Sequence, residues 1–248
     1  MEPFFYTRDL YKSFGGVLAT NGVNLKIEEK GLLSIIGPNG AGKTTLINLV
    51  TGRIPVSSGE VIYEQRDITN RPPHELVKMG VCRTFQITSV FLNLSVFENV
   101  RIAKQAQHGG SLKLLSSRRS LKQVNEQAAS ILERLGLMDR ARIPAKYLAY
   151  GDQRVLEVAI GMAGNPRVLF LDEPTAGMSP AETNRTAQLI RGLAEDLSIV
   201  LIEHDMDVVM SISDRITVMH YGSIIAEGTP KEIQANDVVR EAYLGRDG

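Results

Sequence analysis

The stretch GPNGAGKT, residues 37 to 44, fits the pattern G-x-x-x-x-G-K-[S/T] at all of its fixed positions. Its glycines permit a backbone curl in which several N–H groups point inward at one anion. Lys43 supplies a cation for the terminal phosphates and Thr44 a hydroxyl for Mg²⁺, while a helix beginning at Lys43 adds the positive end of its dipole. A chance match in a chain of this length has a probability of roughly one per cent. The stretch therefore predicts a site for a nucleoside triphosphate and Mg²⁺.

The flanking residues have the pattern that such a loop requires. Residues 32 to 36 are mainly apolar and read as a buried strand, whereas the apolar residues of 46 to 50 repeat with helical spacing until Gly52. Strand, loop and helix thus follow in the expected order. We expect the phosphates to be held by Gly37, Pro38, Asn39, Gly40, Ala41, Gly42, Lys43, Thr44 and Thr45.

Length, charge and cysteine content limit the alternatives. A chain of 248 residues with 43% hydrophobic content can form one large α/β domain with an inserted lobe. Its 28 basic residues balance 28 acidic ones, which argues against a nucleic-acid partner. The single cysteine, Cys82, excludes an internal disulfide, fits a reducing compartment and is expected to serve packing. No signal peptide or long apolar run appears, so we expect a soluble chain that can still have a membrane partner.

The first part of the chain predicts an antiparallel sheet. Residues 4 to 28 form short apolar stretches interrupted by Gly-Gly and Asn-Gly pairs, which is typical of hairpins, and a further hairpin is expected at 59 to 63. A helix is expected near 73 to 79, after a Pro-Pro pair, and a strand over 80 to 86.

The remainder predicts a helical lobe followed by a parallel sheet. Residues 95 to 164 have helical spacing, with one amphipathic helix from Leu121 to Leu135, and a polar connection covers 108 to 120. From residue 167 strands and helices alternate, which is typical of parallel sheets. We expect strands at 168–171, 198–202 and 216–219 and helices at 180–195 and 205–212. The predicted fold is α/β: a single domain, 1–248, with a mainly parallel P-loop NTPase core, an N-terminal antiparallel β subdomain and a helical lobe inserted at about 87–164.

Two carboxylates follow the strand at 168–171. Ligands of parallel sheets collect at the carboxyl ends of the strands, so Asp172 and Glu173 are expected to lie at the phosphate site. Asp172 is placed to hold Mg²⁺ through its water shell, and Glu173 to orient or deprotonate the attacking water. An acid at a strand end usually marks only the start of a loop, but the phosphate loop upstream favours the catalytic interpretation.

With these motifs in order, the chain resembles an ATP-binding cassette (ABC) ATPase over nearly its whole length. The resemblance implies ATP as substrate, Gln86 as the glutamine that contacts Mg²⁺ and the water, and His204 as the histidine near the γ-phosphate. It also implies that Phe14 stacks on adenine and that residues 148 to 153, LAYGDQ, stand where the family has its LSGGQ signature. ATP would then lie between the phosphate loop of one subunit and the signature of another.

The signature departs from the family pattern. The resemblance implies that Ala149, Tyr150, Gly151 and Asp152 meet the nucleotide of a second subunit. Ala149 lacks the hydroxyl of the usual serine, so only backbone donors and the helix N-terminus remain, and we expect a weaker half-site. Asp152 replaces the usual glutamine and would place an acid near a triphosphate. Residues 176 to 179, AGMS, also lack the usual final aspartate.

The subfamily is indicated by three short segments. RTFQ at 83–86, LAYGDQR at 148–154 and AGM at 176–178 resemble the ATP-binding subunits of branched-chain amino-acid importers, while urea, amide and other small-solute importers share much of the pattern. The resemblance implies integral-membrane permease partners, a homodimer or a heterodimer with a second ATPase subunit, and a peripheral position on the cytoplasmic face of the membrane. The transported solute is not readable from this chain.

Three other classes are less well supported by the residues. ABC ATPases of DNA repair or translation bring coiled coils, zinc modules or basic arms, which this chain lacks. A P-loop kinase requires an arginine-bearing lid, and a nucleotide sensor would not need Asp172 with Glu173.

Residues 90 to 97 are unusually apolar for a segment that follows Gln86. Most of them are expected to form the core of the helical lobe. We also expect one or two, Phe91 first, to line a groove for a permease helix, because exposed apolar patches mark partner sites.

Overall fold

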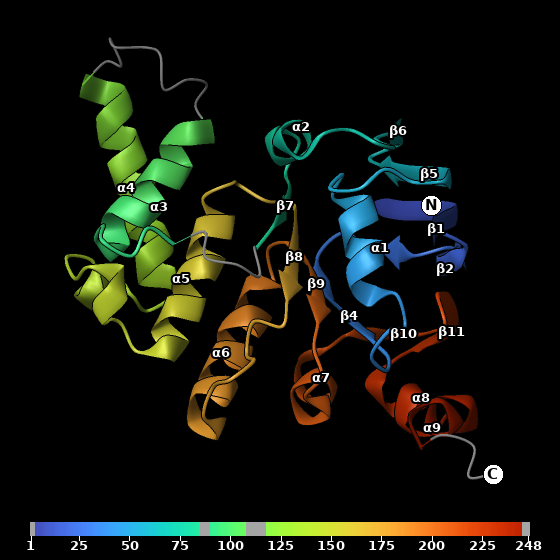
Figure 1. The fold of residues 1–248 in the computed structure, drawn as a ribbon. Helices are drawn as coiled ribbons and strands as arrows, with labels where there is room; N and C mark the ends of the chain where they lie inside the picture. The colour runs from blue at the N-terminus through green and yellow to red at the C-terminus, as the bar shows by residue number, and fades with distance from the viewer. Residues whose placement is uncertain (1–2, 85–89, 108–117, 245–248) are drawn as a thin grey trace.

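We describe a computed structural model of the chain, in which residues 3–84, 90–107 and 118–244 are described. A small antiparallel sheet, a larger mixed sheet and a helical lobe make up the structure (Figure 1). The lobe lies at one side of the mixed sheet and the antiparallel sheet at the other. This arrangement confirms the predicted α/β class, with its N-terminal β subdomain and helical lobe.

The N-terminal sheet has the strand order β2-β1-β5-β6, with β3 also paired to β1, and all of its pairs are antiparallel. Gly15 and Gly16 form the turn between β1 and β2 with positive φ, which glycine adopts readily. The hairpin predicted at 59 to 63 was wrong in its extent, because those residues lie within β5 and the turn follows at Glu64 and Gln65. The strands are β1 (Phe5–Phe14), β2 (Val17–Val23), β3 (Lys26–Ile27), β5 (Ser58–Tyr63) and β6 (Arg66–Asp67).

The larger sheet has the order β11-β10-β4-β9-β8-β7 and is parallel except for the edge strand β11. Its central strands are buried along their length, as expected where helices cover both faces. The carboxyl ends of β4, β9 and β8 are neighbours, which determines where the site forms. The strands are β4 (Gly31–Ile36), β7 (Val81–Arg83), β8 (Val168–Asp172), β9 (Ser198–Ile202), β10 (Arg215–His220) and β11 (Ser223–Gly228).

The helices against this sheet begin and end close to the predicted residues. α6 starts with a capping box, in which Ser179 and Glu182 exchange hydrogen bonds, and Asp205 caps α7 through two backbone N–H groups. Two C-terminal helices and β11 were not predicted from the sequence. The helices are α1 (Lys43–Val50), α2 (Pro73–Lys78), α6 (Pro180–Leu193), α7 (Met206–Ile212), α8 (Pro230–Gln234) and α9 (Asp237–Leu244).

The helical lobe consists of α3 (Val96–Gln107), α4 (Arg118–Arg134) and α5 (Tyr150–Met162), with two 3-10 turns at Met138–Arg140 and Ala145–Tyr147. The predicted amphipathic helix is confirmed as α4, and Gly136 follows it with φ of 67°. Buried side chains of the lobe belong to the same apolar cluster as Leu169 of β8. The lobe is therefore packed onto the sheet through a continuous core.

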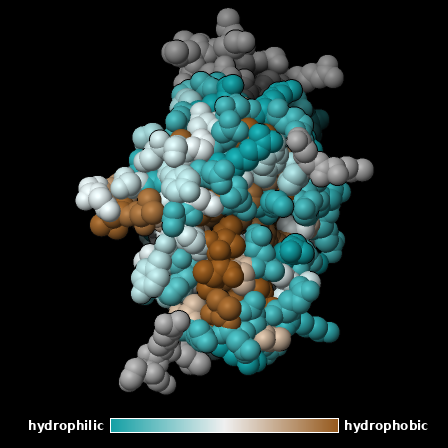
Figure 2. Space-filling view, turned by 90° about the vertical axis from the view of Figure 1, so that its right-hand side faces the viewer, coloured by the Kyte–Doolittle hydropathy of each residue, from teal (hydrophilic) through white to brown (hydrophobic). Residues whose placement is uncertain are grey.

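Cys82 lies on β7 with 3% of its surface exposed, which confirms its packing role. Burial raises the pKa of its thiol to about 12. No helix in the described part of the chain is long and apolar enough to cross a membrane. Figure 2 shows a mostly hydrophilic surface with two apolar areas on the side of the molecule that carries β1, β2 and β11.

Candidate functional site

The loop between β4 and α1 is shaped by its glycines. A Cβ atom on Gly37 would lie 2.1 Å from the backbone oxygen of Met219, and one on Gly42 would lie 2.3 Å from that of Ala19. Both positions therefore exclude any other residue. Gly40, with φ of 80°, has nothing within 4 Å of the corresponding position, so the loop leaves open space at its bend. Such a curl, followed directly by the first turn of α1, has the form of an anion site.

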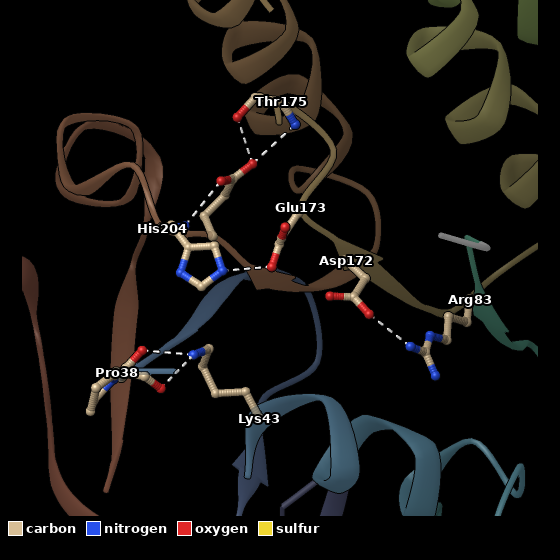
Figure 3. Close-up of polar contacts among 9 residues, drawn as sticks. Pro38, Lys43, Arg83, Asp172, Glu173, Thr175 and His204 are labelled. Atoms are coloured by element: carbon tan, nitrogen blue, oxygen red, sulfur yellow. Dashed lines mark hydrogen bonds and ion pairs between the residues drawn. The ribbon is translucent and has the colours of Figure 1, made fainter. Parts of the chain in front are cut away.

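Lys43 is the first residue of α1, and its side chain folds back onto this loop. Its Nζ donates to the backbone oxygens of Gly37 at 2.6 Å and Pro38 at 3.0 Å, as Figure 3 shows. Burial lowers the pKa of Lys43, and the nearby Glu173 and Asp172 partly offset that effect. A buried cation therefore lies between the loop and two carboxylates.

Both carboxylates stand at the end of β8. Asp172 pairs in register with Ile202 of β9, and β9 in turn pairs with β4, so these residues face the phosphate loop from neighbouring strands. Glu173 has a left-handed backbone with φ of 50°, an uncommon conformation for a residue with a side chain. The strand thus ends in a sharp turn at Glu173, next to the sheet edge where ligands bind.

His204 lies after β9 and meets Glu173 directly. Its Nε2 is 2.6 Å from Oε1 of Glu173, and about half of the histidine side chain is exposed (Figure 3). Glu203, a residue the sequence analysis did not identify, lies between Thr175 and His204 (Figure 3). Its buried carboxylate accepts hydrogen bonds from the N–H and hydroxyl of Thr175 and from the N–H of His204. The turn after Glu173 and the turn carrying His204 are therefore tied together.

A second missed residue, Arg83 at the end of β7, forms an ion pair with Asp172. The distance from Nη2 to Oδ2 is 2.7 Å, and Arg83 also donates to Oδ1 of Asn48 at 2.6 Å. The other oxygen of Asp172, Oδ1, is buried without a hydrogen-bond partner among the described residues. Arg83 begins the RTFQ segment at 83–86, but that segment gave no role for the arginine, and Glu203 belongs to none of the segments identified in the sequence.

The residues present fit a magnesium ion. An unpartnered carboxylate oxygen on Asp172 and the exposed hydroxyl residue Thr44 are hard oxygen donors of the type Mg²⁺ prefers. The described residues contain no cluster of three His, Cys, Asp or Glu side chains suited to a metal. Magnesium is commonly held by one or two protein groups together with substrate phosphates, and Thr44 and Asp172 can supply those groups.

The other predicted contacts belong to other segments of the chain. Phe14 ends β1 with 49% of its surface exposed, and Nζ of Lys12 is 5.0 Å from its ring centroid, so one aromatic face is occupied by a cation. Figure 1 places α5, which carries the signature segment, on the other side of α6 and α7 from α1. Gln86 lies outside the described residues.

The signature segment forms the start of α5. Ala149 is the N-cap and provides no side-chain hydrogen bond, as its chemistry dictates. Asp152, which the sequence predicts near a triphosphate, has two basic partners, because its carboxylate lies 3.2 Å from Arg140 and 3.8 Å from Arg185. Tyr150 is 48% exposed, and its hydroxyl accepts a hydrogen bond from Arg154. At this helix end Ala149 and Tyr150 are exposed, whereas Gly151 is buried against Glu182.

Comparisons with known proteins identify the family of this chain. The ABC transporter family model matches residues 20–176, and the model for branched-chain amino acid ATP-binding cassette transporters matches residues 223–248. The chain is 43% identical to the high-affinity branched-chain amino acid transport ATP-binding protein LivG of Salmonella typhimurium, over 98% of each chain. It is 44% identical to the corresponding protein BraF of Pseudomonas aeruginosa, again over 98% of each.

Solved structures agree as well. The crystal structure of a nucleotide-free ATP-binding cassette from an ABC transporter has a TM-score of 0.87 and 33% identity, covering 99% of this chain and 100% of that one. The ADP conformation of an ATP-binding cassette has a TM-score of 0.88 at 32% identity, with the same coverage.

Proposed function

This chain belongs to the ATP-binding cassette family of transporter ATPases, and on that premise we propose that it hydrolyses ATP to drive the import of branched-chain amino acids through a membrane permease. The observation that carries the solute class is the 43% identity to LivG over nearly the full length of both chains. The match of residues 223–248 to the branched-chain amino acid family supports it independently. The phosphate loop, Asp172 and Glu173 lie together as hydrolysis requires.

ATP binding begins with the loop from Gly37 to Thr45. Its backbone N–H groups and the N-terminus of α1 would surround the phosphates, and Lys43 would transfer its two hydrogen bonds from the loop carbonyls to phosphate oxygens. Phe14 offers its exposed ring to adenine. The carbonyl bonds of Lys43 keep this buried cation satisfied until the substrate arrives.

Thr44, Asp172 and Gln86 are the residues that would hold magnesium. When bound, the ion neutralises charge on the β and γ phosphates. Asp172 would contribute its unpartnered Oδ1, since Oδ2 is taken by Arg83.

Hydrolysis then depends on Glu173 and His204. Glu173 would accept a proton from a water molecule as the water oxygen forms a bond to the γ-phosphorus and the bond from that phosphorus to the β-phosphate oxygen breaks. His204, 2.6 Å from Glu173, would orient the carboxylate and contact the γ-phosphate. Because Glu203 ties both turns together, these two side chains keep their relative positions.

The complete site requires two subunits. The N-terminus of α5 and the phosphate loop of the same chain stand on different sides of α6 and α7, so one chain cannot bring both to one nucleotide (Figure 1). We assign the active form as a dimer in which α5 of each subunit covers the ATP of the other. The second subunit is either a copy of this chain or a related ATPase.

Ala149→Ser is expected to strengthen ATP-driven dimerisation. A serine at this N-cap restores a hydroxyl for the γ-phosphate of the other subunit, and it can also cap α5, which is typically worth about 1 kcal/mol. Light scattering with MgATP on a hydrolysis-deficient background measures the dimer fraction. An unchanged fraction would mean that the backbone donors of α5 already suffice.

The permease is expected to dock into a cleft between α2, β7, α3 and α5. The cleft has a volume of about 340 Å³, with apolar walls from residues such as Ala103 and Ile160 and charges such as Glu157 beside them. Such walls suit an amphipathic helix. Phe91, predicted to line a groove for a permease helix, is 57% exposed but lies before α3 and does not border this cleft, so its contact with the permease stays a prediction.

This assignment is tested by co-purification from detergent extracts, with the membrane protein identified by mass spectrometry. Wild type is expected to retain an integral-membrane permease at the cytoplasmic face, and Ala106→Glu, which places a charge on the exposed wall of the cleft, to lose it. Ala235→Glu at the exposed end of α8 is the matched control and should retain the permease. Equal recovery with both variants would refute the docking site.

A further inference from the structure

Arg83 is a buried cation shared between two parts of the nucleotide site. Its side chain is 6% exposed, and that of its partner Asp172 is 1% exposed. One arm of the guanidinium donates to Asp172 at the end of β8, and the other donates to Asn48 within α1. Arg83 therefore bridges the strand that ends in the metal carboxylate and the helix that follows the phosphate loop.

The ion pair involves only one of the two carboxylate oxygens of Asp172. Arg83 binds Oδ2 alone, and Oδ1 has no partner among the described residues. Figure 3 shows Oδ2 turned toward Arg83 and the other oxygen turned to the side on which Lys43 and Glu173 lie. A fork-to-fork pair would have occupied both oxygens. The guanidinium thus fixes the carboxylate plane and leaves the oxygen that faces the site available.

Arg83 also borders the cleft described above. Cys82, Arg83 and Thr84 form part of its wall, opposite Ala103 of α3 and Ile160 of α5. The same guanidinium consequently touches the Asp172 carboxylate and lies at the surface against which a helix in the cleft would rest. Burial lowers the pKa of Arg83, and its hydrogen bond to Asp172 partly offsets this effect.

We propose that Arg83 is a positioning residue that holds Asp172 in its Mg²⁺-binding orientation and transmits occupancy of the cleft to that carboxylate. The orientation of Asp172 concerns this chain alone, whereas the transmission from the cleft rests on the proposed permease function. A helix entering the cleft would move or fix β7 at Arg83, and because Asp172 has its only described side-chain partner there, its carboxylate would follow. The role differs from that of Glu173, because the Arg83 guanidinium is bonded to Asp172 and Asn48 and would act through that carboxylate.

The test on the isolated chain is a titration of a fluorescent ATP analogue at a series of free Mg²⁺ concentrations. For Arg83→Met, the Mg²⁺ concentration that gives half of the Mg²⁺-dependent gain in nucleotide affinity is expected to rise about tenfold or more. Residues that orient metal ligands typically contribute about 10–100-fold in metal affinity. Nucleotide affinity in EDTA should stay at the wild-type value. Arg83→Lys should show a smaller rise in the same direction, because an ammonium cannot bridge Asp172 and Asn48 as the planar fork does.

Arg71→Met is the matched control, since Arg71 forms an exposed ion pair with Glu75 on α2, and it should leave the Mg²⁺ midpoint unchanged. If Arg83→Met does not fold by circular dichroism, Asn48→Ala removes one anchor of the guanidinium, leaves the ion pair in place and should still raise the midpoint. An unchanged midpoint in folded Arg83 variants, or an equal loss of affinity in EDTA, would overturn the positioning role.

The transmission from the cleft to Asp172 is measured as the ATPase rate of the complex with the permease divided by the ATPase rate of the isolated chain. This ratio is expected to fall in Arg83→Lys and to stay at the wild-type value in Arg71→Met. An undiminished ratio in Arg83→Lys would overturn the coupling. Failure to recover any permease would count against the proposed function alone, because the Mg²⁺ titration does not depend on it.

Discussion

Glu173→Gln is expected to lower the rate of ATP hydrolysis by about 10² or more while leaving ATP binding intact. Glutamine keeps the shape of the side chain and its contact with His204, but it cannot accept the proton of the attacking water. Only the transition state loses an interaction, so the turnover number should fall while the dissociation constant for ATP does not. Phosphate release and binding of a fluorescent ATP analogue, measured on the same preparation, separate the two.

A control for this variant is Glu195→Gln, which makes the same chemical change at an exposed position after α6. It should hydrolyse ATP at the wild-type rate. Hydrolysis by Glu173→Gln at the wild-type rate would show that Glu173 is not the general base. His204, whose Nε2 lies 2.6 Å from Glu173, would then be the next candidate for that role.

Lys43→Ala is expected to weaken ATP binding by at least about 100-fold, because two charge-assisted hydrogen bonds contribute about 1.5–3 kcal/mol each. The lysine is 6% exposed and already lies inside the loop, so its position is prepared before the substrate binds. Loss of the side chain leaves the backbone donors in place, which is why some affinity should persist. Calorimetric titration with ATP measures the change.

Lys26→Ala, on the exposed side of β3, is the control for charge and should bind ATP as the wild type does. Wild-type affinity in Lys43→Ala would show that ATP binds elsewhere on the chain, and the assignment of the loop at 37 to 45 would then be wrong.

The parts of the structure that were predicted from sequence are those encoded by neighbouring residues. The loop at 37–44, the helix that begins at Lys43 and the helix predicted at 180–195 depend on short patterns with a direct physical reason. The alternation after residue 167 likewise indicated a parallel sheet. Its strand order, β11-β10-β4-β9-β8-β7, required pairing between distant segments, which no local pattern specifies.

The parts that were missed depend on contacts across the fold. Arg83 and Asp172 are 89 positions apart, and Thr175 and Glu203 are 28 apart, so neither pair has a spacing that a motif could reveal. The partners of Asp152 were missed for the same reason, since Arg140 and Arg185 come from different segments. β11, α8 and α9 contain only six, five and eight residues, so each offers a short local pattern.

Uptake of labelled leucine into proteoliposomes tests the central claim most directly. The vesicles would contain the permease that co-purifies with this chain, a leucine-binding component where the system needs one, and ATP on the side that carries the ATPase. We predict uptake that requires ATP and Mg²⁺ and is lost when Glu173→Gln replaces the wild-type chain. Leucine uptake that continues without ATP, or equally with Glu173→Gln, would contradict the account.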